Sequence, residues 1–204
     1  MLKHFFPNKF IRSRKLIASI NPKLFQLRYG KRMKLGTKVR FNGLPLIDVH
    51  KDAMIKIGNR VTLNSENNSY HVMLHSCVKL MADREGAIIE IGDDTRIHGS
   101  CLHAYTKVSI GQGCLIAANC NIIDGNGHDL SMDDVMNRKN TRGSASAVII
   151  EDNVWIGTNV LVLPGTHIGH GSVISAASVV KGEIPPKSLI GGNPAIILKR
   201  FQTH

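Results

Sequence analysis

Residues 148–180 read VIIEDNVWIGTNVLVLPGTHIGHGSVISAASVV, and an aliphatic side chain returns at every sixth position of this stretch. These positions are Ile150, Ile156, Val162, Ile168, Ile174 and Val180. A period of six fits neither the turn of an α-helix nor a long alternating strand. Because six is even, one side chain per repeat still points inward from a short strand. Three strands with their turns close a triangular coil of about eighteen residues, so the stretch predicts the stacked coils of a parallel β-helix.

The same period extends toward the N-terminus in shorter and fainter runs. From the clearest to the faintest, the matches are Ile110, Ile116, Ile122, Ile91, Ile97, Leu35, Phe41, Ile47, Ile57 and Leu63. Residues 64–88 fit the period poorly. We therefore expect an all-β domain over residues 33–183, with its register least certain at the start.

Three cysteines, Cys101, Cys114 and Cys120, are expected at the small inward position two residues before an aliphatic one. A free Cys packs there as a small hydrophobe. No CxxC pair occurs in the chain, so we expect no metal site.

Three segments lie outside this pattern. Residues 1–32 are basic and in part helical in pattern, and we expect them to cap the first coil. Residues 124–147 form a polar loop inserted between two regular coils, after which the repeat resumes at Val148. Residues 184–204 form a C-terminal tail. A loop of this length inside a regular repeat is typical of a functional site.

The net charge of +11 is concentrated at one end, because residues 1–40 hold 12 Lys and Arg and no Asp or Glu. Such a block attracts phosphate, anionic lipid or an acidic polymer. Two roles of this basic block are compatible with the sequence: a solvated cap on the first coil, and a peripheral membrane contact through residues 1–40. No zinc-finger spacing or aromatic-interleaved RNA motif occurs, so we expect no nucleic-acid partner. No apolar run spans a bilayer and no signal peptide is seen, which favours a cytoplasmic location, with the inner face of the membrane as the alternative.

Four short stretches resemble a known family: DGNGH at 124–128, VWIG at 154–157, PGTHIG at 164–169 and GGNPA at 191–195. Together with the repeat they resemble the hexapeptide-repeat acyltransferases. Within that family the likeness is greatest to the galactoside, maltose and xenobiotic acetyltransferases and their polysaccharide O-acetyltransferase relatives. The resemblance is dense over residues 89–200.

This resemblance implies a homotrimer of left-handed β-helices that takes acetyl-CoA as co-substrate in a groove between subunits. His128, at the start of the protruding loop, matches the family's catalytic base. The positions that match its cofactor contacts are Thr158, Ala176, Lys181, Lys199 and Arg200. Lys181–Gly182 stands where many relatives have Thr-Lys, so this chain differs from the family's pattern at the residues expected to contact the phosphate.

Acyl transfer from a thioester needs a base, a stabilised oxyanion and two substrates held close together. Imidazole accepts a proton near neutral pH, which suits His128. In the family the oxyanion donor follows VWIG, so we expect the Thr158 amide to serve. No Ser or Cys nucleophile motif is present, which favours direct transfer. The candidates for binding the acceptor are Ser100, His103, Tyr105, Asn126 and Trp155.

The leading interpretation is O-acetylation of a carbohydrate, as part of a surface polysaccharide or its precursor. N-acetylation of a nucleotide-linked amino sugar and acetylation of a small antibiotic or of serine are the enzymatic alternatives. Two further alternatives remain. One is a γ-type zinc carbonic anhydrase with His98 and His103 as metal ligands, and the other is a non-catalytic scaffold. The DGNGH and GGNPA motifs favour the acyltransferase over both.

Overall fold

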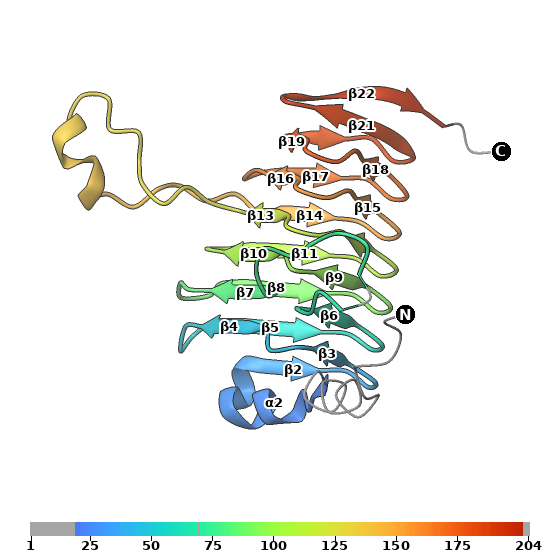
Figure 1. Cartoon of the computed structure of the whole chain (residues 1–204). Helices are drawn as coiled ribbons and strands as arrows, with labels where there is room; N and C mark the ends of the chain where they lie inside the picture. The colour runs from blue at the N-terminus through green and yellow to red at the C-terminus, as the bar shows by residue number, and fades with distance from the viewer. Residues whose placement is uncertain (1–18, 69, 202–204) are drawn as a thin grey trace, which may run out of the picture.

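The computed structural model describes residues 19–68 and 70–201, which form three parallel sheets wound into a stack of triangular coils (Figure 1). Sheet A contains β1 (Ser19–Ile20), β3 (Arg40–Asn42), β6 (Thr62–Asn64), β9 (Arg96–His98), β12 (Leu115–Ile116), β15 (Trp155–Ile156), β18 (Val173–Ile174), β21 (Ser188–Gly192) and β22 (Ala195–Arg200). Sheet C contains β4 (Leu46–Val49), β7 (Lys79–Ala82), β10 (Cys101–Ala104), β13 (Asn121–Ile123), β16 (Leu161–Val162) and β19 (Val179–Val180). Sheet B contains β2 (Met33–Leu35), β5 (Met54–Ile57), β8 (Ile88–Ile91), β11 (Lys107–Ile110), β14 (Val148–Ile150), β17 (His167–Ile168) and β20 (Glu183–Ile184). The fold is the predicted left-handed parallel β-helix.

The six-residue period is the inward column of this helix. Every aliphatic residue from Ile150 to Val180 at that spacing is at most 1% exposed. The residues two positions earlier are buried as well, and among them Thr166, Ser172 and Ser178 direct their hydroxyls to backbone carbonyls. A narrow interior filled by stacked Ile and Val needs few aromatic residues, which accounts for the low aromatic content.

One expectation about the core is wrong. Cys114 and Cys120 are buried as predicted, but Cys101 points outward and is half-buried, and Ser100 takes the small inward position. The reason is that the spacing shortens here from six residues to five, between buried Ile97 and buried Leu102. A shift of one residue moves a side chain to the other face of a strand.

The described part of the N-terminal segment covers the first coil. Helix α2 (Lys23–Tyr29) and the 3₁₀ turn η1 (Gly30–Arg32) lie beneath it (Figure 1). The Phe25 ring packs edge-on against Phe41 at 5.3 Å between centroids. The Tyr29 hydroxyl donates to the Ile47 carbonyl at 2.6 Å. Residues 1–18, on which part of the expected membrane contact falls, lie outside the described residues. No described helix is long and apolar enough to cross a bilayer.

At the other end, the parallel ladder continues past residue 183 through β20 and β21. Strand β22 then folds back antiparallel onto β21, with Leu189 opposite Lys199. The C-terminal segment therefore extends sheet A, and it carries its basic residues onto that sheet.

The loop at 124–147, here called the arm, leaves the body between β13 and β14 and contains the 3₁₀ turn η2 (Val135–Asn140) (Figure 1). Its first residue, Asp124, is fully buried. The Asp124 carboxylate accepts the backbone N–H groups of Tyr105, Thr106 and Lys107, each at 2.7 Å. Because Asp124 binds three donors of the coil below, the base of the arm is fixed to the body while its tip extends into solvent.

A second insertion explains why residues 64–88 fit the period poorly. Residues 65–78 leave the coil at the corner between sheets A and C, which we call the A/C corner. Asn67 bonds both the N–H and the carbonyl of Leu74, and the Asn119 side chain bonds the backbone of Met73 and His75. The Asn67 amide closes the insertion on itself, and the Asn119 amide ties it to the coil two further along.

The tight stacking of coils makes Gly92 a sensitive position. A Cβ atom there would lie 2.5 Å from the backbone N of Gln112 and the backbone C of Gly111. We expect Gly92→Ala to lower the free energy of unfolding by about 1–3 kcal/mol, as for other overpacked sites. Urea unfolding followed by circular dichroism measures this change. Gly127→Ala is the control, because a Cβ atom at Gly127 would have no neighbour within 4 Å; equal stability of the two variants would contradict the expectation.

The anchoring of the arm predicts a local effect at Asp124. In Asp124→Asn an amide N–H₂ faces backbone donors, so we expect a loss of about 1.5–3 kcal/mol of local stability. Hydrogen exchange read by mass spectrometry should then quicken about tenfold or more in residues 124–147, with little change in the coils. Asp129→Asn is the matched control, since Asp129 is exposed and bonds only within the arm, to the N–H of Ser131. Unaltered exchange in Asp124→Asn would show that the arm is held by something else.

Candidate active site

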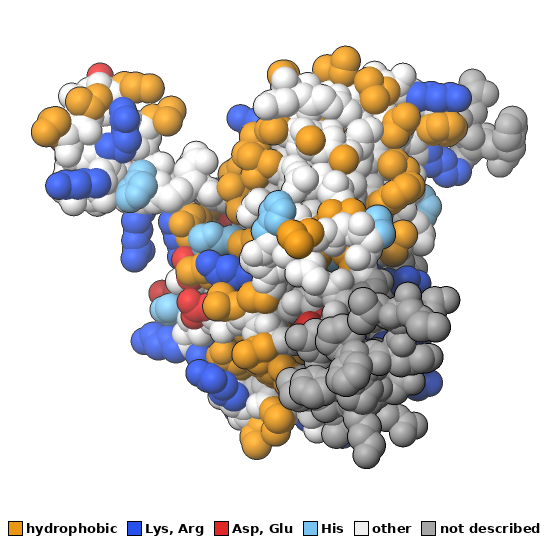
Figure 2. All heavy atoms as spheres, in the orientation of Figure 1, with side chains coloured by type: hydrophobic (Ala, Val, Ile, Leu, Met, Phe, Trp, Pro, Cys, Tyr) orange, Lys and Arg blue, Asp and Glu red, His pale blue; other side chains and the backbone are white. Residues whose placement is uncertain are grey.

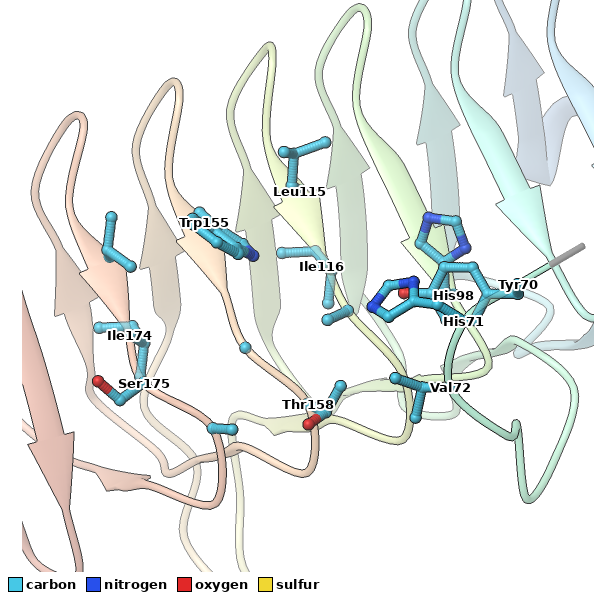
Figure 3. A pocket seen from close by; sticks show the side chains of 14 residues that line it. Tyr70, His71, Val72, His98, Leu115, Ile116, Trp155, Thr158, Ile174 and Ser175 are labelled. Atoms are coloured by element: carbon cyan, nitrogen blue, oxygen red, sulfur yellow. The ribbon is translucent and has the colours of Figure 1, made fainter.

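The candidate site is an elongated cavity of about 660 Å³ on the outer face of sheet A and along the A/C corner (Figure 3). Its floor is apolar, because Leu115, Trp155 and Val173 stand one above the other on adjacent strands. Each of these residues directly precedes a buried Ile in the sequence. Because successive side chains of a strand point to opposite faces, all three point outward. This volume is in the range of small-molecule sites.

Two of the predicted cofactor residues, Thr158 and Ala176, lie together in this cavity with Trp155. Both are in turns at the A/C corner, one coil apart, and the Thr158 carbonyl accepts the N–H of Ala177 at 2.8 Å. Side chains must be small here, since a Cβ on Gly157 would lie 2.7 Å from the Ala176 nitrogen. Within the described residues the Thr158 N–H donates to no protein acceptor, so it is available to a ligand oxygen.

Tyr70, His71 and His98 gather at the end of the cavity nearer the N-terminus (Figure 3). The Tyr70 and His98 rings stack at 4.2 Å between centroids and 14° between planes. Burial, followed by the charges of Arg96 and His71, lowers the pKa of His98 to about 4. His98 is therefore neutral near pH 7. The sequence did not point to Tyr70 and His71, because the insertion that carries them has no repeat from which to place it.

His128 and Asn126 lie on the arm and do not line the cavity. His128 is exposed, and Asn126 donates its N–H to the Ser144 carbonyl at 3.0 Å. The arm stands clear of the body, with apolar side chains toward its tip (Figure 2). The exposed large apolar residues of the arm are Leu130, Met132, Val135 and Met136.

Two predicted acceptor residues, His103 and Tyr105, pack at the base of the arm. Tyr105 covers Gly125, where a Cβ would lie 2.3 Å from its ring, and the His103 ring meets Tyr105 edge-on at 4.5 Å. Arg84 lies over the Tyr105 ring at 3.3 Å and donates to the Gly143 carbonyl. Nε2 of His103 is 3.1 Å from an Asp83 carboxylate oxygen, without the alignment of a hydrogen bond.

The prediction for Ser100 is wrong. Ser100 is 1% exposed, and its hydroxyl lies 2.8 Å from the His98 carbonyl and 2.9 Å from the Ala117 carbonyl. It also accepts the N–H of Cys120. The hydroxyl is part of the interior and does not face an acceptor.

The remaining predicted residues are on two different faces. Lys199 and Arg200 lie on β22, beyond the C-terminal end of the cavity on sheet A. Lys181 is exposed in the turn from β19 to β20, on the same corner as the base of the arm and away from Thr158. One chain therefore holds a cofactor-sized cavity at one corner and His128 at another.

The positions of the histidines and cysteines favour neither a metal centre nor a reactive thiol. His98 is on sheet A and His103 on sheet C, and no three His, Cys, Asp or Glu side chains in the described ranges lie close enough to hold one ion. Burial raises the pKa of the Cys114 thiol to about 11 and also raises that of Cys120. Neither is a thiolate at neutral pH, and reactivity requires the thiolate.

Residues 147–182 match the family described as bacterial transferase hexapeptide (six repeats). The chain is 43% identical over 133 residues to WbbJ of Escherichia coli K12, named as a putative lipopolysaccharide biosynthesis O-acetyl transferase, and the match covers 62% of this chain and 68% of WbbJ.

Solved structures of low identity have the same fold. The N-acyltransferase AntD of Bacillus cereus, solved as its D94A mutant with dTDP and coenzyme A, superimposes with a TM-score of 0.70 at 17% identity, covering 91% of each chain. The hexapeptide-repeat acetyltransferase VCA0836 of Vibrio cholerae, solved with acetyl-CoA, gives a TM-score of 0.57 at 21% identity, covering 98% of this chain and 94% of that one. With the repeat, the cavity and these relatives in agreement, the chain belongs to the hexapeptide-repeat acyltransferases and is an acetyltransferase that uses acetyl-CoA.

Proposed function

We propose that the chain transfers the acetyl group of acetyl-CoA to a hydroxyl of a sugar in a surface polysaccharide or its precursor, with His128 as general base. The observation that carries this proposal is the small-residue cavity at Thr158 and Ala176, which has a free backbone N–H and an apolar floor. The similarity to WbbJ favours oxygen over nitrogen as the acceptor atom and a lipopolysaccharide-type carbohydrate as its source.

Acetyl-CoA lies along the A/C corner in this proposal. Pantetheine is a thin chain, and the small residues Gly157 and Ala176 leave it room beside the coil. The acetyl end is placed near Trp155, and the nucleotide end points toward β22. Lys199 and Arg200 are placed there to meet its phosphates, while Lys181 is on a different corner of the same chain.

The base comes from a second copy of the chain. The arm carries His128 away from its own cavity, and its exposed tip bears four large apolar side chains that a neighbouring subunit would cover. A closed ring of three subunits lets each arm reach the A/C corner of the next. The proposed active site therefore forms between subunits of a homotrimer.

The transfer needs no covalent enzyme intermediate. The acceptor oxygen attacks the thioester carbonyl while His128 takes its proton. The oxyanion that forms is stabilised by the N–H of Thr158. On collapse the C–S bond breaks, and the imidazolium returns the proton to the sulfur of coenzyme A, so charge and protons balance.

A second candidate is N-acylation of a nucleotide-linked amino sugar. It is favoured by the fold shared with AntD, an N-acyltransferase solved with dTDP and coenzyme A. An amine acceptor would also need a base, so His128 has the same role in either reaction.

The His128→Ala variant tests the role of this residue as the base. We expect kcat to fall about 100- to 10,000-fold, while the trimer and acetyl-CoA binding are retained. Acceptor-dependent release of free thiol, measured against a panel of sugars, amino sugars and isolated polysaccharides, gives the rate and identifies the acceptor. His170→Ala, which removes another exposed imidazole from a turn, is the control. A rate in His128→Ala equal to that of the control would eliminate His128 as the base.

Co-expression of two inactive variants tests whether the site is shared. His128→Ala retains an open groove, and Ala176→Trp blocks the groove but retains the imidazole. Trimers that contain both variants should recover about a third of the wild-type activity, because in each of them one of the three sites joins an intact groove of one variant to an intact arm of the other. Differently tagged chains and tandem purification isolate the mixed trimers. Activity no greater than that of the separate variants would place both residues in the same subunit's site.

A further inference from the structure

The outer face of sheet A bears a column of side chains, one per strand, whose character changes along its length. In order from the N-terminal end they are Arg40, Thr62, Arg96, Leu115, Trp155, Val173, Leu189 and Lys199. The column is cationic at both ends and apolar in the middle, where the cavity of the candidate active site lies. Such a face suits two substrates that are each anionic at one end and react through their neutral ends.

The N-terminal part of the column lines a second cavity, of about 870 Å³. His98 lines both cavities, so they are adjacent at this residue. Four cations line the second cavity, and its one carboxylate, Asp94, is already bonded by Arg60 through Nε at 2.6 Å and Nη2 at 2.7 Å. The other three cations are Lys38, Arg40 and Arg96.

Among residues 19–68 and 70–201 these three cations have no counter-charge. No described residue forms an ion pair or a side-chain hydrogen bond with Lys38, Arg40 or Arg96. The residues outside the described ranges contain no Asp or Glu at all, so they supply no carboxylate side chain either. The positive charge on this face is therefore available to a ligand.

Sheet B shows how the same chain treats cations on two strands that flank a third. Glu90 on β8 lies directly opposite Lys56 of β5 and diagonally from Lys107 of β11, and it bonds both, at 2.7 Å and 2.8 Å. On sheet A the equivalent place, on the strand between Arg40 and Arg96, is taken by Thr62. A hydroxyl replaces the carboxylate, which leaves two guanidinium groups on either side of a neutral donor.

We propose that Arg40, Thr62 and Arg96 bind the phosphate or pyrophosphate group through which the acceptor sugar is attached to its carrier. Guanidinium groups bind phosphate through paired N–H bonds, and the Thr62 hydroxyl supplies a further donor between them. The inference rests on the sugar acetylation proposed above, and it defines the acceptor as an activated or carrier-linked sugar.

The position of the site fits this assignment. Arg96 and Trp155 are two strand spacings apart on sheet A, or about 10 Å. One or two sugar rings fit between a phosphate at Arg96 and a hydroxyl presented at Trp155. The Tyr70–His98 stack lies along this path and offers flat, uncharged faces on which a sugar ring can pack.

Binding of inorganic pyrophosphate to the full-length trimer tests the site without turnover, so its result does not depend on whether the chain acetylates a sugar. Titration calorimetry is run on the wild type, on Arg40→Ala/Arg96→Ala, on Thr62→Glu and on the control Lys56→Ala. Thr62→Glu places a carboxylate between the arginines, as Glu90 does on sheet B. We expect affinity to fall about tenfold or more in the first two variants and to be unchanged in Lys56→Ala, with thermal unfolding of all four proteins alike.

A nucleoside diphosphate and phosphatidylcholine vesicles containing a polyprenyl diphosphate then distinguish the two carriers. Tighter binding of the nucleoside diphosphate than of pyrophosphate supports a nucleotide-linked sugar, and Thr62-dependent retention on the vesicles supports a lipid-linked one. Pyrophosphate binding that is absent, or that Thr62→Glu leaves intact, overturns the proposal. Displacement of the bound pyrophosphate by acetyl-CoA also overturns it, because the groove would then belong to the phosphates of the cofactor.

Discussion

The hydrogen bonds between successive coils set the position of everything else in this molecule. From β2 to β21 each strand of sheets A, B and C pairs with the strand one coil away, in parallel and in register, so equivalent residues of neighbouring coils are directly superposed. Inside the helix this produces stacked Ile and Val. Outside it produces straight columns of side chains at a spacing of about 4.8 Å. A binding surface here is a choice of residues along one column, which is why a strand-by-strand change from Arg to Leu to Trp creates regions of different chemistry on a rigid face.

Departures from the repeat occur at corners, where no ladder bonds are lost. The arm leaves at the corner between sheets C and B, and residues 65–78 leave at the A/C corner. Both are held by hydrogen bonds of polar side chains, from buried Asp124 for the arm and from Asn67 and Asn119 for the other insertion. The cavity and the base of the arm are thus on separate corners of one chain, and the proposed chemistry depends on a neighbour that brings an arm to a cavity.

The sequence predicted the features that follow from the repeat. Aliphatic residues six apart specified the coils, and the break after Ile122 located the arm. Thr158 and Ala176, predicted from the family resemblance, share a cavity with Trp155, a predicted acceptor residue. The failures have local physical causes. A five-residue step turned Cys101 outward and Ser100 inward. Tyr70 and His71 are in an insertion that is held by the Asn67 amide within it and by the Asn119 amide two coils further along. Acceptor binding by His103 and Tyr105 stays a prediction; the structure adds that Tyr105 packs on Gly125 and under Arg84 at the base of the arm.

The arm has a further consequence for how such a protein changes over evolutionary time. Val108 pairs with Val148, and Ile110 with Ile150, although the whole arm lies between them in sequence. The coils join across the insertion as if it were absent, so its length and composition are free to vary without disturbing the scaffold. Loops of different shape could be grafted at this point while the cofactor groove is left as it is. A single scaffold of this kind can diversify into enzymes for many acceptors by exchanging one removable module.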